Sequence, residues 1–332
     1  MVRVGARSLS QLIGAVAVTA VAWIAGAGTS AASDRYALVV TGASGGPQYA
    51  EKYDAWRSAV VQTLQGSLRL AERNVLVLAE DEGAGTEKVT RDNVKAALAT
   101  LRQRAKKDDV VFVLLMGHGS GTEADEAKFN LIGPDLSAQE WADLFAPLKA
   151  RLVFVNAASG SFPFLSALSA RNRIVISAND TAAQQYETVL PEFFLAALRD
   201  TNADLDKNGR VSVWEAFVHA SAGVKNWYEQ RGQLPTERPV LDDDGDGVGQ
   251  QSDEVGTDGI LAKVTYIAAD EPIDETADAE MNALLRRRVE LNREIEELRA
   301  RKPLMDPEEY ERELEKLLLD LARVDRDLRS KS

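Results

Sequence analysis

Short apolar runs alternate along the chain with longer segments whose apolar residues recur at helical spacing. The runs predict strands at residues 36–41, 74–78, 110–116, 152–155 and 173–177. They do not alternate apolar and polar positions, so both faces of each strand are expected to be buried. Strands of this kind, separated by helices, predict a three-layer α/β/α fold with a mostly parallel sheet.

The segments between these runs predict the covering helices. Residues 49–65 carry one apolar face, and a further helix is expected to begin near Thr90. An acidic helix is predicted at 137–148, where Ser137 and Glu140 have the spacing of a capping box. Later segments predict a helix at 192–199, a second helix ending near Arg231, a loop rich in Asp and Gly at 235–259 and a final strand at 260–268.

The last fifty or so residues have a different pattern, because their apolar residues recur at heptad spacing. Residues 281–298 and 310–328 form two such arms, with Arg288 as an exception in the first. Asp306 and Pro307 suit the start of the second helix. The pattern predicts an antiparallel helical hairpin or coiled coil. Arms this short are marginal alone, so the hairpin is expected to close on itself, pack on the domain or pair with another chain.

The N-terminus has the three parts of a secretory signal peptide. Arg3 and Arg7 precede an apolar run at 12–28, and small residues follow at 29–33. Residues 1–32 are therefore predicted to be removed on export to a periplasmic or extracellular location, with no stable membrane span after cleavage. The alternative is an uncleaved membrane anchor. The predicted organisation continues with a domain at 33–269, a linker at 270–280 and the hairpin at 281–329.

Composition narrows the classes of function. The chain has 332 residues, a formal net charge of −13, two histidines and no cysteine. The acidic charge argues against nucleic acid as a partner, because binding phosphates needs a basic surface. Without cysteine, no disulfide holds the exported domain together, and a zinc site built from His and Cys is excluded.

Two small-residue turns follow predicted strands and hold the candidate catalytic groups. His118-Gly119 follows the third strand, and Ser159-Gly160 lies just after the fourth. Active sites of parallel sheets lie beyond the carboxyl ends of strands. The pattern resembles the legumain/caspase clan of cysteine peptidases, whose members carry a strand ending in His-Gly and a second strand ending in Ala-Cys-x-Ser-Gly.

The resemblance covers roughly residues 36–268 and implies a caspase-like version of the fold. It assigns His118 as the base, the Gly119 N–H as an oxyanion donor and Ala157 as the position of the nucleophile. A methyl group cannot attack a carbonyl, so a catalytically inactive pseudopeptidase is expected. Two alternatives remain. His118 is an ordinary polar loop residue, or Ser159 or Ser161 replaces the cysteine, although serine needs stronger activation.

The segment 204–215 matches the loop of an EF-hand. Side-chain oxygens stand at loop positions 1, 3, 5, 9 and 12, and glycine stands at position 6. Calcium prefers six to eight oxygen ligands. The candidate Ca²⁺ ligands are Asp204, Asp206, Asn208, the carbonyl of Arg210, Ser212 and Glu215. The alternative is an acidic loop without a metal.

A second acidic segment, 242–253, repeats the early half of this motif with Asp242, Asp244 and Asp246. Asp253 stands at position 12, but Gly249 occupies the usually apolar position 8, and no helical pattern flanks the loop. Asp258-Gly259 could extend the loop. Calcium binding and a solvated acidic turn therefore both remain open here.

Together these features predict an exported, calcium-stabilised pseudopeptidase that binds or scaffolds a protein or peptide partner. One alternative is an active hydrolase that uses Ser159 or Ser161 with His118. Another is a structural module that assembles, for example as a homo-oligomer, through its C-terminal hairpin.

Overall fold

The computed structural model describes residues 33–121, 126–270 and 278–331, which belong to one compact unit. The predicted signal peptide, residues 1–32, and most of the predicted linker lie outside the described residues. Within the described ranges, none of the helices has the length and apolar character needed to cross a membrane.

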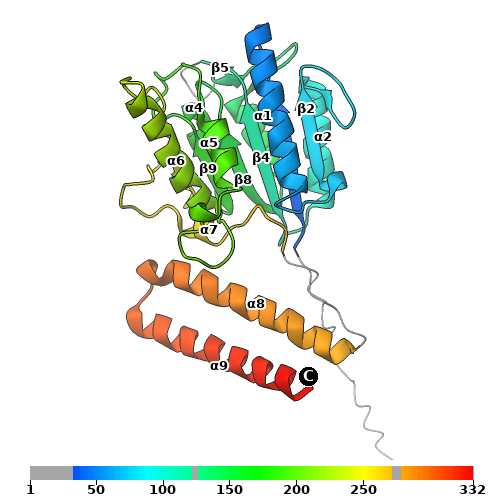
Figure 1. Cartoon of the computed structure of the whole chain (residues 1–332), viewed down its shortest axis with the longest axis vertical. Helices are drawn as coiled ribbons and strands as arrows, with labels where there is room; N and C mark the ends of the chain where they lie inside the picture. Colours follow the sequence, from blue (N-terminus) through cyan, green and yellow to red (C-terminus); the bar gives the residue numbers. More distant parts are fainter. Residues whose placement is uncertain (1–32, 122–125, 271–277, 332) are drawn as a thin grey trace, which may run out of the picture. The chain divides into compact units, whose positions relative to one another are not determined.

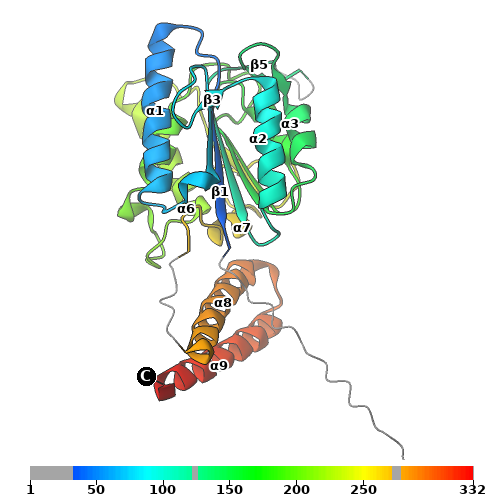
Figure 2. The same cartoon turned by 90° about the vertical axis from the view of Figure 1, so that its right-hand side faces the viewer.

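A seven-stranded sheet forms the middle layer (Figures 1 and 2), in the order β10-β9-β8-β4-β1-β2-β3. All neighbouring strands pair in parallel except β10 with β9. The predicted α/β/α fold with a mostly parallel sheet is therefore confirmed. The strands are β1 (Arg35–Thr41), β2 (Val75–Ala79), β3 (Glu87–Lys88), β4 (Val110–Met116), β8 (Arg151–Asn156), β9 (Arg173–Ser177) and β10 (Val240–Asp242).

Helices cover both faces of the sheet, which Figure 2 shows edge-on between α1 and the pair α2 and α3. One face packs against α1 (Pro47–Gln65), α5 (Leu190–Ala197) and α6 (Val213–Gln230). The other packs against α2 (Arg91–Arg104), α3 (Ala138–Phe145) and α4 (Phe162–Leu168). Successive strand residues enter opposite clusters, which explains why the strands are apolar throughout.

Local sequence signals set several helix starts as predicted. Thr90 caps α2 by accepting the Asn93 N–H, and Ser137 and Glu140 form the capping box of α3. The remaining short elements are η1 (Glu72–Asn74), η2 (Thr201–Ala203), α7 (Ile260–Lys263), η3 (Lys302–Leu304) and the small sheet of β5 (Gly119–Ser120), β6 (Lys128–Phe129) and β7 (Leu136–Ser137).

One predicted strand is wrong, because residues 260–268 form the short helix α7 and an irregular segment. The carboxylate of Asp243 accepts the N–H groups of Gly259 and Ala262, which satisfies the start of a helix. The antiparallel strand that closes the sheet is instead β10, inside the segment predicted to be a loop.

The C-terminal segment forms the predicted hairpin of α8 (Ala279–Arg301) and α9 (Pro307–Lys331), which run side by side (Figure 1). Asp306 accepts the N–H groups of Glu308 and Glu309 and so caps α9 as expected. The buried residues of the seam include Leu291, Ile295, Leu298, Tyr310 and Leu328.

Candidate functional site

The turns after β4 and β8 meet at the carboxyl edge of the sheet. Their strands are neighbours, and the Ala157 N–H still donates to the Leu115 carbonyl at 2.9 Å. Just beyond, the Gly119 N–H donates to the Ser159 Oγ at 3.2 Å. A Cβ atom at Gly119 would lie 2.4 Å from the Ser159 carbonyl oxygen, so only glycine fits without displacement of the backbone. The structure thus brings the His-Gly and Ser-Gly turns into contact.

The half-buried ring of His118 lies against two tyrosines of α1. Its Nε2 and the Tyr53 hydroxyl share a hydrogen bond of 3.1 Å. Tyr49 approaches the ring edge-on, with centroids 4.7 Å apart. Burial raises the pKa of Tyr53, so this hydroxyl stays neutral. The imidazole is therefore held by α1. The two tyrosines stand four residues apart on one predicted helix, which was the signal available in the sequence.

Ala157, the predicted nucleophile position, is 1% exposed. Its methyl group belongs to the apolar cluster that also contains Met116 and Tyr53. Its carbonyl oxygen accepts a hydrogen bond from the buried Thr188 hydroxyl. Ala157 and the partner of His118 thus share one side of the sheet, but the position is enclosed by packed side chains.

Ser159 and Ser161, the alternative nucleophiles, are engaged elsewhere. Ser159 Oγ accepts the Gly119 N–H, which is the group that the resemblance assigns to an oxyanion. Ser161 is 0% exposed; its hydroxyl donates to Asn179 Oδ1 at 2.9 Å and accepts the Ala178 N–H at 3.1 Å. Within the described part of the chain, neither serine has a hydrogen bond to His118.

The buried carboxyl group of Glu237 holds the segment at the start of α5. Glu237 is 1% exposed and accepts the N–H groups of Val189 and Leu190, at 2.7 and 2.8 Å. Burial raises the pKa of Glu237 to about 8, although the two N–H donors act in the opposite direction. Val189 and Leu190 follow Thr188, so this carboxyl group anchors the segment that bonds to Ala157. Its isolated position in a predicted loop gave no signal in the sequence.

The first acidic loop gathers three carboxylates. Oxygen atoms of Asp204, Asp206 and Glu215 lie within 4.8 Å of one another. Gly209, at the sixth loop position, has a φ of 88°, the left-handed conformation that favours glycine. The buried Glu215 reaches back to accept the Leu205 and Asp206 N–H groups, at 2.8 and 3.2 Å. These acidic residues could hold a metal ion.

The surroundings of this loop differ in part from the prediction. The incoming α-helix, α5, ends at Ala197, and the 3₁₀ turn η2 leads into Asp204. Ser212 and Glu215 form a capping box at the start of α6.

The electrostatics of the loop favour a cation. Burial and the neighbouring carboxylates, partly offset by the Asn208 N–H, raise the pKa of Asp206. A cation would relieve the repulsion among these groups.

The second acidic loop gathers Asp242, Asp244 and Asp246, whose oxygens also lie within 4.8 Å of one another. Asp253, at the expected twelfth position, does not belong to this cluster. Asp258 folds onto the loop instead and accepts the Asp243 N–H at 2.7 Å. Burial raises the pKa of Asp258 to about 7. The second loop therefore matches the motif at its start and departs from it at its end.

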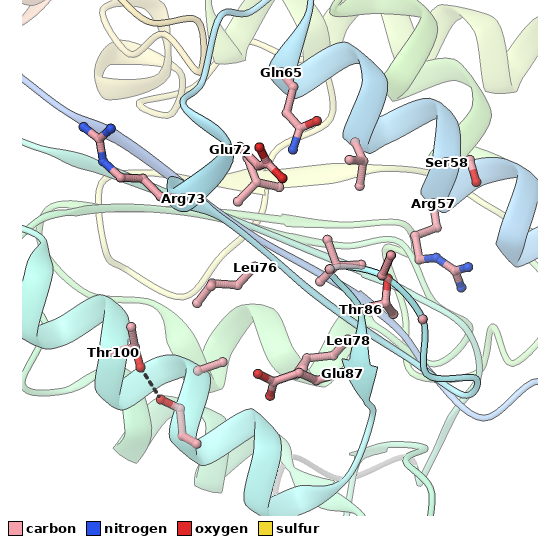
Figure 3. A pocket seen from close by; sticks show the side chains of 18 residues that line it. Arg57, Ser58, Gln65, Glu72, Arg73, Leu76, Leu78, Thr86, Glu87 and Thr100 are labelled. Carbon is pink, nitrogen blue, oxygen red and sulfur yellow. Dashed lines mark hydrogen bonds between the residues drawn. The ribbon is translucent and has the colours of Figure 1, made fainter.

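A separate groove of about 1070 Å³ lies over β2, between α1 and α2 (Figure 3). Leu76 and Leu78 contribute apolar surface, and Arg57, Glu72 and Arg73 add charge. It contains none of the site residues predicted from the sequence.

The comparisons with known proteins add little to these observations. No family model matches the chain, and no curated protein matches it. Among solved structures, a Geobacter sulfurreducens protein is 12% identical, with 66% of this chain and 97% of that chain covered and a TM-score of 0.42. The Drosophila initiator caspase Dronc is 13% identical, with 74% and 98% covered and a TM-score of 0.43. Similarity at this level carries no argument about function.

Proposed function

We propose that this chain is an exported, non-catalytic protein of the legumain/caspase type that acts as a cation-stabilised binding or scaffold protein. The observation that carries the proposal is the contact between the two turns. The Gly119 N–H, which would have to bind an oxyanion, donates to Ser159. Ala157 offers no nucleophile and is enclosed. A covalent mechanism requires a nucleophile within reach of its base. The methyl group of Ala157 is not a nucleophile, and within the described residues neither Ser159 nor Ser161 has a hydrogen bond to His118, which supports the proposal.

The chain has no cysteine, so a single introduced thiol reports on one position alone. The accessibility of position 157 can therefore be measured directly. In Ala157→Cys, burial should slow alkylation by iodoacetamide at least tenfold relative to Ser120→Cys, whose site is exposed. Intact-mass spectrometry gives both rates. Equal labelling of the two variants under native conditions would show an open site and contradict the proposal.

The serine hydrolase remains the competing function, and it has its own test. Wild type is expected to leave a broad peptide library uncleaved and to ignore a fluorophosphonate probe. Turnover that disappears in Ser159→Ala or Ser161→Ala would replace the proposed function with this alternative.

Calcium is the cation that we propose for the first acidic loop. All its candidate ligands are oxygens, the donor type that Ca²⁺ prefers. Asp204, Asp206 and Glu215 would supply charge, and the carbonyl of Arg210 would complete one side. His219, the nearest imidazole in sequence, lies 3.7 Å from Asp200, outside the carboxylate cluster. The bound ion would neutralise the converging carboxylates and tie the start of α6 to the loop.

A further inference from the structure

The α9 helix has an apolar strip beside the seam that it forms with α8. Leu318 is 44% exposed at the middle of the helix. Leu314 and Leu321, one helical turn away on either side, are half-buried, and Ala322 is exposed. A two-helix seam covers its apolar residues from one side only, so this strip remains in contact with water. Exposed apolar strips of this kind are typical of surfaces that bind a partner.

The charges on α9 differ between its first third and the remainder. Residues 308–315 contain five glutamates and one arginine, whereas residues 316–331 contain five lysines or arginines and three aspartates. The first third is therefore acidic, and the remainder carries a small net positive charge. An antiparallel second copy of the same helix would place each acidic segment beside the positively charged end of the other copy. A parallel copy would place like charges together, which is unfavourable.

We propose that α9 pairs antiparallel with α9 of a second copy of this chain, around a two-fold axis near its centre. Around this axis the Leu318 side chains of the two copies lie near one another, and Glu308 and Glu311 near the start of one helix lie beside Arg329 and Lys331 near the end of the other. The two hairpins then form a four-helix arrangement, which buries the strip.

The contact is small. A helix of 25 residues is about 37 Å long, and a face about 10 Å wide gives roughly 370 Å² per copy. The two copies together bury about 740 Å², less than the roughly 1,200–2,000 Å² of stable specific interfaces. The dimer is therefore expected to be weak, with a dissociation constant of about 100 μM or higher.

The proposal names the partner of the hairpin and does not depend on the closed histidine site. If the protein is monomeric in solution, the α9 pairing fails, but the proposed burial of Ala157 is unaffected. If the protein cleaves peptides, the proposed non-catalytic function fails, but the α9 pairing is unaffected.

The first test compares two exposed leucines, one on the strip and one outside α9. Residues 33–332 are examined by sedimentation equilibrium up to about 1 mM, because a weak dimer forms only at high concentration. Leu318→Glu should raise the dissociation constant at least tenfold. Leu304→Glu, whose parent side chain lies in η3 and is 63% exposed, should leave it unchanged. A monomeric wild type, or equal effects of the two variants, would overturn the proposal.

The second test uses the two-fold symmetry. Glu311→Arg and Arg329→Glu should each weaken self-association by placing like charges opposite one another. Mixed in equal amounts, the two variants should form a heterodimer of near wild-type affinity, and the Glu311→Arg/Arg329→Glu double variant should recover the homodimer. Circular dichroism checks that α9 stays helical in each variant. Independent, additive weakening with no recovery on mixing would contradict the antiparallel pairing.

Discussion

The histidine turn and the first acidic loop are both hydrogen-bonded within the chain, but only the loop brings like charges together. At the turn, the chain supplies the partners, since Gly119 bonds to Ser159 and His118 to Tyr53. In the loop, the carboxylates of Asp204, Asp206 and Glu215 are brought together, and their charges repel one another. A site whose groups bond to one another gains little from a ligand, whereas converging anions gain much from a cation. The comparison therefore separates a site whose polar groups have partners in the chain from a loop whose clustered carboxylates could hold a metal ion.

The largest expected effect is a loss of stability when a side chain is added at the histidine turn. Gly119→Ala would place a Cβ atom 2.4 Å from the Ser159 carbonyl oxygen and 3.0 Å from that of Lys128. Both are backbone atoms that cannot rotate away, so the free energy of unfolding should fall by about 3 kcal/mol. Urea denaturation measures the change. Gly83→Ala, where a Cβ meets open space, is the matched control. Equal stability of Gly119→Ala and wild type would mean that the two turns are not in contact.

The acidic loop should respond to calcium instead. At a concentration one hundred times the dissociation constant, binding to the folded state adds about 2.7 kcal/mol, or roughly 5–10 °C in melting temperature for a domain of this size. Sites of the extracellular type can require millimolar calcium. Thermal melting with calcium and with chelator should show this rise in wild type.

Two variants make the calcium response specific. Glu215→Gln should lose the rise, because it removes one of the three clustered carboxylates. Asp253→Asn should keep it, since Asp253 is exposed and lies outside both clusters. A melting temperature of wild type that is the same with calcium and with chelator would reduce the loop to an acidic turn.

A pH dependence belongs to the histidine side of the comparison, and it is the smallest effect over any single pH unit. The pKa of Glu237 rises from 4.5 to about 8, so the folded state favours the protonated carboxyl group. This contribution is fully present below the unfolded pKa and is lost as the pH rises through about 8. Stability should therefore fall by about 1 kcal/mol per pH unit between about pH 5 and 8.

Substitution isolates this contribution from other titrating groups. Glu237→Gln should flatten the slope of urea midpoints against pH, even if it lowers stability throughout. Glu229→Gln, on the exposed side of α6, should leave the slope unchanged. Identical slopes for wild type and Glu237→Gln would assign the pH dependence elsewhere.

The sequence predicted the parts of the fold that depend on local patterns. Continuous apolar runs located the five long parallel strands, and the Ser137 capping box located α3. It did not predict β10 or α7, because both are short and are fixed by contacts with β9 and Asp243. Elements of three or four residues have no periodicity of their own to detect.

The candidate sites divide in the same way. The glycine and carboxylates of the first loop lie within twelve successive positions, so their gathering could be predicted. Tyr53 lies 65 residues before His118, and only the packing of α1 on the sheet brings the two together. Likewise, the use of Ser159 as the acceptor for Gly119 depends on the exact pairing of β4 with β8.

The second acidic loop also covers one edge of the sheet. β10 is an edge strand, and an unpaired edge offers a template to strands of other molecules. The chain returns after Asp246 so that Leu241 and Gln250 exchange two backbone hydrogen bonds, at 2.9 and 2.8 Å. The opposite edge, β3, is only Glu87 and Lys88, and both are charged and exposed. If residues 242–250 were released from β10, the bare edge would favour intermolecular strand pairing. The second acidic loop thus occupies part of an edge that strands of other molecules could otherwise pair with.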